Sequence, residues 1–246
     1  MSCAVSILKR ELKGYFATPV AYVFIVIFLF LTGLFTFQLG GLYGEGNGQA
    51  DLGAFFVWHP WLYLFLIPAV AMRLWAEERK SGTVELLLTL PVSLPQAILG
   101  KFIAAWLFIG IALALTFPTV LTVMYLGDPD MGIIIASYCG SFLMAGAFLA
   151  IGICMSALSS NQVVGFIIAV VVCFLLILAG HEPVLAAFRG WAPGWLVDAI
   201  ASVSFLTHFS LVQRGLIRVT DLVFFVTLII GWLTACGVIL EMKKAE

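Results

Sequence analysis

Charge is scarce in this chain, because only 10% of its 246 residues are Asp, Glu, Lys or Arg while 63% are hydrophobic. Water-soluble domains carry charges on about a quarter of their residues and are about half apolar. A mean hydropathy of +1.15 therefore excludes a soluble globular domain and predicts a polytopic membrane protein. The formal net charge of −1 is uninformative, since what matters is where Lys and Arg lie relative to the spans.

The chain also lacks a phosphate-binding loop. The pair Gly100-Lys101 is followed by Phe102, and neither the earlier glycine nor the hydroxyl residue of such a loop is present. We expect that the chain does not hydrolyse ATP and holds no cofactor of its own.

Metal-ligand and redox patterns are absent as well. The three histidines, His59, His181 and His208, have no His or Cys partner at metal-ligand spacing. All three are expected near the outer surface, with His59-Pro60-Trp61 as an interfacial turn. The five cysteines form no CxxC pair, so they are expected to be small buried hydrophobes and not a metal or disulfide framework.

Long uncharged runs define the spans, because a helix needs about 20 apolar residues to cross the hydrocarbon core. Five such runs occur, and the run 131–180 is long enough to cross twice, with a polar break at SALSSNQ. The predicted fold is an all-α membrane protein with six transmembrane helices, at about 20–42, 54–74, 96–126, 132–156, 162–180 and 220–241.

Basic residues predict the orientation. They precede the first span, lie between the second and third spans and follow the sixth. In the loops after the first and third spans, by contrast, all charged residues are acidic. The positive-inside rule therefore places both termini in the cytoplasm. A signal peptide is not expected, because the first apolar run is too long and no small-residue cleavage site follows it.

Two further segments are neither simple spans nor simple loops. Residues 4–17 alternate apolar and charged side chains at helical spacing, which predicts an interfacial helix before the first span. Residues 182–218 are rich in aromatic residues but broken by proline and glycine. We interpret this segment as short re-entrant helices in the outer leaflet, with its tryptophans at headgroup level.

The densest charge cluster lies at 76–91, between the second and third spans. Glu77, Glu78, Arg79 and Lys80 are followed by a Ser-Gly break, and 83–90 can form a short helix of about 12 Å that a proline ends. The spans themselves hold essentially no ionisable residue to couple an ion gradient, so energy must arrive from outside the membrane domain. An ordinary interfacial helix joining two spans is the alternative interpretation.

At these residues the sequence resembles a known family. The run Arg73, Glu77, Lys80, Gly82-Thr83, Glu85-Leu86-Leu87-Leu88-Thr89, Pro91 and Gly100-Lys101 is similar to the signature of the membrane permeases of type-two ABC exporters. The segments LKRELKGYF, SALSSNQVVGFIIAVVVCF and HFSLVQRGLIRVTDLVFF resemble the gliding-motility branch of that class. The resemblance extends over most of the chain.

The resemblance implies a permease of the bacterial inner membrane that exports a substrate with ATP hydrolysed elsewhere. It implies two copies of a cytoplasmic ABC ATPase that bind ATP and Mg, and a second permease chain, identical or related. A periplasmic or membrane accessory subunit is a further candidate partner, membrane lipid surrounds the protein, and no nucleic acid is involved.

The resemblance also implies that 76–91 contains a coupling helix. The ATPase contacts would be Glu77, Glu78, Arg79, Gly82, Thr83 and Glu85, and a second cytoplasmic contact would involve Ser159, Ser160, Asn161 and Gln162.

Two other function classes stay open from the residues alone. The same loop could serve a membrane scaffold that recruits a cytoplasmic partner without transport. An integral-membrane enzyme would need paired carboxylates, histidine clusters or an activated nucleophile, none of which the sequence offers. The uncharged spans, with seven Trp and 21 Phe in the chain, favour an amphipathic or lipid-linked cargo for a transporter.

Overall fold

The computed structural model describes residues 3–39, 52–80, 82, 93–190, 192–216 and 218–243. All regular elements in these ranges are helices, and no strand occurs among them. The predicted all-α membrane fold is confirmed. The helices are α1 (Cys3–Ala17), α2 (Pro19–Leu34), the π-helical η1 (Phe35–Leu39), α3 (Gly53–Val57), α4 (His59–Ala71), α5 (Arg73–Lys80), α7 (Leu94–Ala114), α8 (Phe117–Leu126), α9 (Met131–Leu158), α10 (Gln162–Leu178), α11 (Glu182–Arg189), α12 (Gly194–Ser202), α13 (Phe205–Val212) and α14 (Val219–Met242).

Helix starts follow from local sequence. The carboxylate of Asp130 accepts hydrogen bonds from the backbone N–H groups of Gly132 and Ile133, and the side chain of Asn161 accepts one from Val163. These caps satisfy donors that the first turn of a helix leaves without a partner. Proline lies in the first turn of α2, α4, α7, α8 and α11, where its missing N–H costs nothing.

Four helical stretches are long and apolar enough to cross a membrane: Pro19–Leu39, Leu94–Leu126, Met131–Leu158 and Val219–Met242. The number rises to six if the bent pairs α10 with α11 and α12 with α13 each count as one span. The predicted second span, 54–74, corresponds to α3, α4 and the start of α5, which are interrupted at Trp58 and Met72. The predicted interfacial helix 4–17 corresponds to α1, and 182–218 contains α11, α12 and α13.

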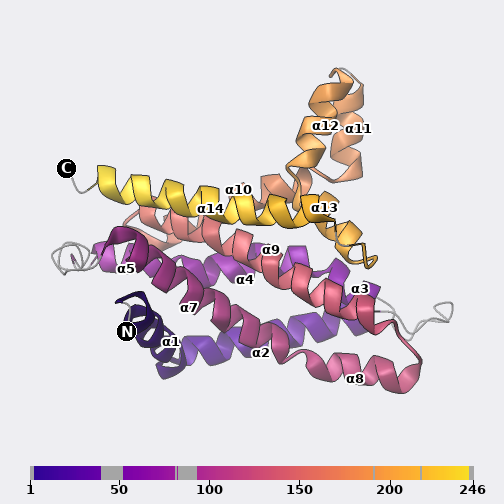
Figure 1. Cartoon of the computed structure of the whole chain (residues 1–246), viewed down its shortest axis with the longest axis horizontal. Helices are drawn as coiled ribbons and strands as arrows, with labels where there is room; N and C mark the ends of the chain where they lie inside the picture. The colour runs from indigo at the N-terminus through magenta and orange to yellow at the C-terminus, as the bar shows by residue number, and fades with distance from the viewer. Residues whose placement is uncertain are drawn as a thin grey trace.

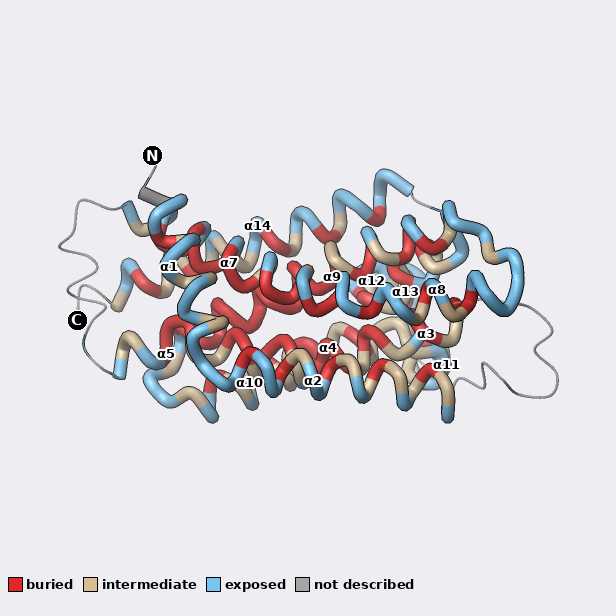
Figure 2. Tube along the Cα trace, turned by 90° about the horizontal axis from the view of Figure 1, so that it is seen from below, coloured by how far each residue is buried: buried red, intermediate tan, exposed pale blue. Residues whose placement is uncertain are grey.

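The core is built around α9. This helix packs against α4, α5, α7, α10, α13 and α14, and every residue from Met144 to Cys154 is buried, as the buried centre of the tube in Figure 2 shows. Small residues permit the close packing. A Cβ atom on Gly152 would lie 2.5 Å from the Cβ of Ala71, so α9 and α4 approach more closely there than alanine would allow.

The helices run side by side between two ends (Figure 1). The end that carries α1, α5, both chain termini and the last turns of α9 and α14 is named the terminal end. The opposite end, with α3, α8 and the start of α14, is named the distal end. The α11–α12 pair projects sideways from the bundle near the distal end, because α11 bends by 68° from α10 and α12 bends by 65° from α13.

His59, at the start of α4, is covered by aromatic side chains. The helix does break at Trp58, as an interfacial turn requires, but His59 is fully buried. Its ring lies within 4.6 to 6.2 Å of the rings of Phe55, Phe56, Tyr63 and Phe28, and its Nδ1 donates to the Phe55 carbonyl at 3.1 Å. Aromatic residues from α2 and α3 converge on the start of α4 and cover the imidazole.

Candidate functional site

The candidate site is the terminal end of the bundle, where α5 carries the predicted charge cluster. Helix α4 ends at Ala71 and α5 begins at Arg73, so the chain is interrupted at Met72 before the cluster. Helix α5 packs against α4, α9 and α10. It is therefore held by the bundle along one side and carries charge on the other.

Ser156, fully buried in the last turns of α9, holds this interruption in place. Its hydroxyl donates to the Met72 carbonyl at 2.8 Å and accepts from the backbone N–H groups of Trp75 and Ala76 at 3.2 and 3.1 Å. The first N–H groups of a helix have no partner within it. Ser156 supplies one from another helix and so ties the start of α5 to α9.

Lys101 of α7 is the second organising residue, and only 2% of its surface is exposed. Its ammonium lies 2.7 Å from a carboxylate oxygen of Glu78 on α5 and 3.2 Å from one of Glu11 on α1. The Trp75 ring lies below it, with the centroid 5.3 Å away. A buried ammonium is tolerated only when it is paired, and here the pairing joins three helices.

The ionisation of Glu11 reflects this arrangement. Burial alone would raise the pKa of the carboxyl, but attraction to Lys101 and hydrogen bonds from Arg10 and Lys101 outweigh it, so the pKa lies below its ordinary value of 4.5. The carboxylate is therefore charged at neutral pH. The charges of Arg10, Glu11, Glu78 and Lys101 balance within the group.

The last turn of α9 receives two more cationic side chains. Arg79 of α5 donates to the Ala157 carbonyl at 2.9 Å, and Lys243, just after α14, donates to the Leu158 carbonyl. Carbonyls at a helix C-terminus lack intrahelical partners and carry partial negative charge, so both contacts are favourable. A displacement of α5 would thus act directly on the end of the central helix.

The predicted ATPase-contact residues occupy different environments. Glu77 faces outward with 59% of its side chain exposed and lies 3.8 Å from Arg73. Glu78 and Arg79 instead contact the bundle through Lys101 and the Ala157 carbonyl. Gly82 has φ +70°, a left-handed conformation that favours glycine. The predicted Thr83 and Glu85, and with them the short helix at 83–90, lie outside the described residues.

The predicted second contact is the turn between α9 and α10, which lies at the same end of the bundle (Figure 1). The Ser159 hydroxyl accepts from the backbone N–H of Asn161 at 3.0 Å, and the Asn161 side chain accepts from Val163 at 3.0 Å. Ser160 and Asn161 are exposed, while Ser159 and Gln162 are half-buried. Since α5 packs against both α9 and α10, the structure brings this turn close to the charge cluster.

Sequence reasoning missed Glu11, Trp75, Lys101 and Ser156 as members of this site. Lys101 gave a signal, because a lysine inside the apolar run LPQAILGKFIAAW needs an anionic partner if that run is a buried helix. The expectation that the spans hold essentially no ionisable residue was wrong at Lys101 of α7 and at Asp221 of α14, each only 2% exposed.

At the distal end Asp221 pairs with His208. The Nδ1 of His208 lies 2.6 Å from an Asp221 oxygen, its Nε2 lies 2.9 Å from the Ser202 carbonyl, and its ring stacks on Phe224 at 4.0 Å. This pair joins α13 to α14. No cluster of three or more His, Cys, Asp or Glu side chains that could hold a metal occurs among the described residues.

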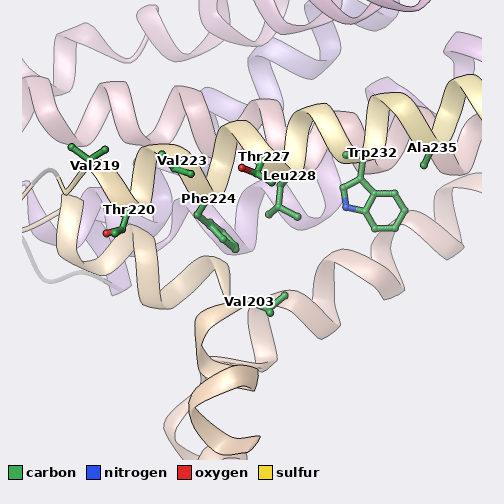
Figure 3. A pocket seen from close by; sticks show the side chains of 10 residues that line it. Val203, Val219, Thr220, Val223, Phe224, Thr227, Leu228, Trp232 and Ala235 are labelled. Carbon is green, nitrogen blue, oxygen red and sulfur yellow. The ribbon is translucent and has the colours of Figure 1, made fainter. Parts of the chain in front are cut away.

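An apolar groove of about 740 Å³ lies along α14, lined by Val203 and nine residues between Val219 and Ala235. Figure 3 shows Phe224, Leu228 and Trp232 projecting from α14 on its outward side, with Val203 facing them. A groove with this lining suits lipid tails or another apolar helix, and it lies away from the charged site.

These features define a helical, multi-pass membrane protein whose helices are joined at the terminal end by buried ion pairs. Residues 5–193 match the family described as "ABC-2 family transporter protein", which is more than half of the chain. The chain therefore belongs to this family and is a membrane permease component of an ABC-2 transporter. Such permeases are transport subunits distinct from the ATPase and generally pair with ATPase subunits. No curated protein matches the chain.

Proposed function

We propose that this chain is the permease of an ABC exporter of the gliding-motility branch, and that it moves an amphipathic or lipid-linked substrate across the bacterial inner membrane. Two copies of a cytoplasmic ATPase drive it, and it pairs with a second permease chain, identical or related. Both termini, and hence the terminal end, face the cytoplasm.

The observation that carries this proposal is the attachment of α5 to the bundle. A helix that receives force from an ATPase must present polar groups outward and be fastened inward. Glu77 is exposed, while Glu78, Arg79 and the N-terminus of α5 are fastened to α7 and α9. The predicted contact residues thus divide into two roles. The ATPase would contact Glu77, Gly82, Thr83 and Glu85. Its second contact would be the turn of Ser159, Ser160, Asn161 and Gln162. The displacement of α5 would be transmitted to the bundle by Glu78 and Arg79.

The test is co-purification of the tagged permease from native membranes, followed by an ATPase assay. We expect an ATPase subunit to accompany the wild-type chain. Charge reversal by Glu77→Lys or Glu85→Lys should detach it or uncouple hydrolysis from transport. The matched control is Asp128→Lys, a charge reversal at an exposed residue of the distal end. Retention of the ATPase and normal transport in both cytoplasmic variants would contradict the proposed contact.

A membrane scaffold is the second candidate, and the same preparation separates the two. A partner without nucleotide-binding motifs, or function that does not depend on ATP hydrolysis, would favour the scaffold. The family membership favours the permease, because members of this family are transport subunits.

A further inference from the structure

The interfacial helix α1 places its charges on opposite sides. Its one acidic residue, Glu11, turns toward the bundle, where its side chain is 19% exposed and its carboxylate lies 3.2 Å from the Lys101 ammonium. The three basic residues of the helix, Lys9, Arg10 and Lys13, are exposed on the other side. Three cations against one anion leave α1 with a net charge of +2, and this excess faces away from the bundle.

Two of these cations are not neutralised within the described part of the chain. Arg10 pairs with Glu11 at 2.9 Å. Lys9 and Lys13 lie about one helical turn apart, and neither has a hydrogen-bond or ion-pair partner among the residues that the structure describes. Like charges four residues apart on a helix repel each other. An anion supplied from outside the helix would therefore stabilise both lysines.

The position of α1 puts the lysines at the membrane boundary. Helix α1 ends at Ala17, and the first apolar span begins at Pro19. Figure 1 shows α1 beside the start of this span at the terminal end. Exposed apolar side chains follow at once, with Val20, Tyr22 and Val23 on the surface of α2. The cations of α1 therefore lie at the level where lipid headgroups begin.

An aromatic contact shows that the lysine side of α1 adjoins the lipid-facing side of α2. Phe16 follows Lys9 by seven residues, which is close to two helical turns, so the two side chains lie on the same side of α1. The Phe16 ring meets the Tyr22 ring edge-on, with centroids 6.4 Å apart, and Tyr22 is 56% exposed on α2. Tyrosine at the end of a span is typical of the membrane interface. The lysine side is thus continuous with a surface that contacts lipid.

We propose that this outward side of α1 binds anionic phospholipid in the leaflet that surrounds the terminal end, through Lys9 and Lys13. Charge complementarity selects the occupant. Phosphatidylglycerol presents a phosphate without an ammonium beside it, whereas phosphatidylethanolamine and phosphatidylcholine carry an ammonium that already balances their phosphate. Basic segments beside a span attract anionic lipid in this way. The inference rests on α1 and its surroundings and does not depend on the transport function proposed above.

Native mass spectrometry of the delipidated full chain in mild detergent, without the ATPase, tests this surface. The chain is titrated with dioleoyl phosphatidylglycerol, phosphatidylethanolamine or phosphatidylcholine. We expect phosphatidylglycerol to bind about 25-fold more tightly than the other two lipids, because each lysine near the surface contributes about fivefold. Raising the ammonium acetate concentration from about 0.1 M to about 1 M should reduce this preference, since the screening length falls from about 10 Å to about 3 Å.

Variants locate the lipid on α1. Lys9→Gln and Lys13→Gln should each weaken phosphatidylglycerol binding about fivefold, and the double variant should lose the preference for this lipid. The double variant Lys9→Arg with Lys13→Arg keeps both charges and should bind as the wild type does. The matched control Lys80→Gln removes an exposed cation from the end of α5 and should leave lipid binding unchanged.

Equal binding of phosphatidylglycerol and phosphatidylethanolamine by the wild type would overturn the proposal. An equal loss in Lys80→Gln and in the α1 variants would overturn it too, because the preference would then belong to the whole terminal end. The α1 variants change exposed residues to glutamine, a good helix former, so their thermal midpoints should match the wild type and exclude misfolding as the cause of a loss.

A further outcome would assign this side of α1 to a different partner. If the double glutamine variant keeps its lipid preference but no longer co-purifies with an ATPase, the lysines contact the ATPase and the lipid proposal is wrong. If it loses the lipid preference while the ATPase is retained, the lipid proposal stands. Lipid binding is measured on the permease alone, so a failure of the transport proposal gives a different result.

Discussion

The two ends of the bundle hold their helices together by different chemistry. At the terminal end, buried charge and hydrogen bonds join α1, α5, α7 and α9 through Lys101, Ser156 and Arg79. Lys243, just after α14, joins the end of that helix to α9. At the distal end, aromatic rings pack edge-on against His59 and stack on Phe205, and His208 pairs with Asp221.

This difference indicates which end of the bundle can transmit a displacement of α5. The hydrophobic contribution of aromatic packing is non-directional, whereas a buried charged network depends on every partner and is destabilised strongly when one partner leaves. The terminal end is thus suited to transmit a displacement of α5, and the distal end to adapt to it. Four predictions test this comparison.

The largest effect is expected from Lys101→Met, which leaves the carboxylates of Glu11 and Glu78 without their shared cation. Loss of one partner of a buried ion pair typically costs about 3–5 kcal/mol. The thermal midpoint in detergent should fall sharply, and the double variant Lys101→Met with Glu78→Met should recover part of the loss.

Asp221→Asn at the distal end is the comparison for Lys101→Met. It keeps the shape of the side chain and a hydrogen-bonding group for His208, so its effect on the midpoint should be clearly smaller. A larger loss for Asp221→Asn would reverse the contrast between the two ends.

The second effect concerns packing and not charge. In Gly152→Ala, the new Cβ would lie 2.5 Å from the Ala71 Cβ, and such overpacking costs about 1–3 kcal/mol. Gly33→Ala, with no atom within 4 Å of the new Cβ, should be neutral or stabilising by up to about 1 kcal/mol. Unfolding midpoints of the two variants, measured side by side, check this difference, and equal midpoints would argue against the close contact of α9 and α4.

The third prediction separates stability from coupling. Ser156→Ala removes the three hydrogen bonds that tie the start of α5 to α9 and should cost about 1–3 kcal/mol. Its matched control is Ser141→Ala, also on α9, which removes a buried hydrogen bond of 2.7 Å to Tyr63 of α4. Only Ser156→Ala should also lower substrate-stimulated ATP hydrolysis in the complete transporter. Equal effects of both variants on coupling would show that Ser156 is merely structural.

The smallest effect is a pH dependence. The pKa of Glu11 is lowered in the folded protein, so its ionised form stabilises the fold at neutral pH, and this contribution is lost as the pH falls below the ordinary value of 4.5. Glu11→Gln should therefore be less stable than the wild type at pH 7, and the two should converge under acid conditions. Midpoints measured from pH 7 to well below pH 4.5 test this, and a gap that widens toward acid would contradict the sign.

Much of the fold followed from hydropathy. The uncharged run 131–180 with its SALSSNQ break predicted α9 and α10, which begin or end within two residues of the expected bounds. The attachment of α5 to α9 could not be predicted from the sequence pattern. Ser156 lies about 80 residues from the α5 backbone that it binds, and a hydrophobic pattern describes only residues that are near neighbours in the chain.

The sequence by itself determined the membrane class, the positions of the long helices and the charge cluster on α5, because hydropathy and charge are local properties. Only the tertiary structure decided which charges face inward. Glu77 and Glu78 are adjacent and chemically alike, yet a helix turns about 100° per residue, so Glu78 meets Lys101 while Glu77 faces outward. The same packing buried His59, since its contacts depend on how α2, α3 and α4 approach one another.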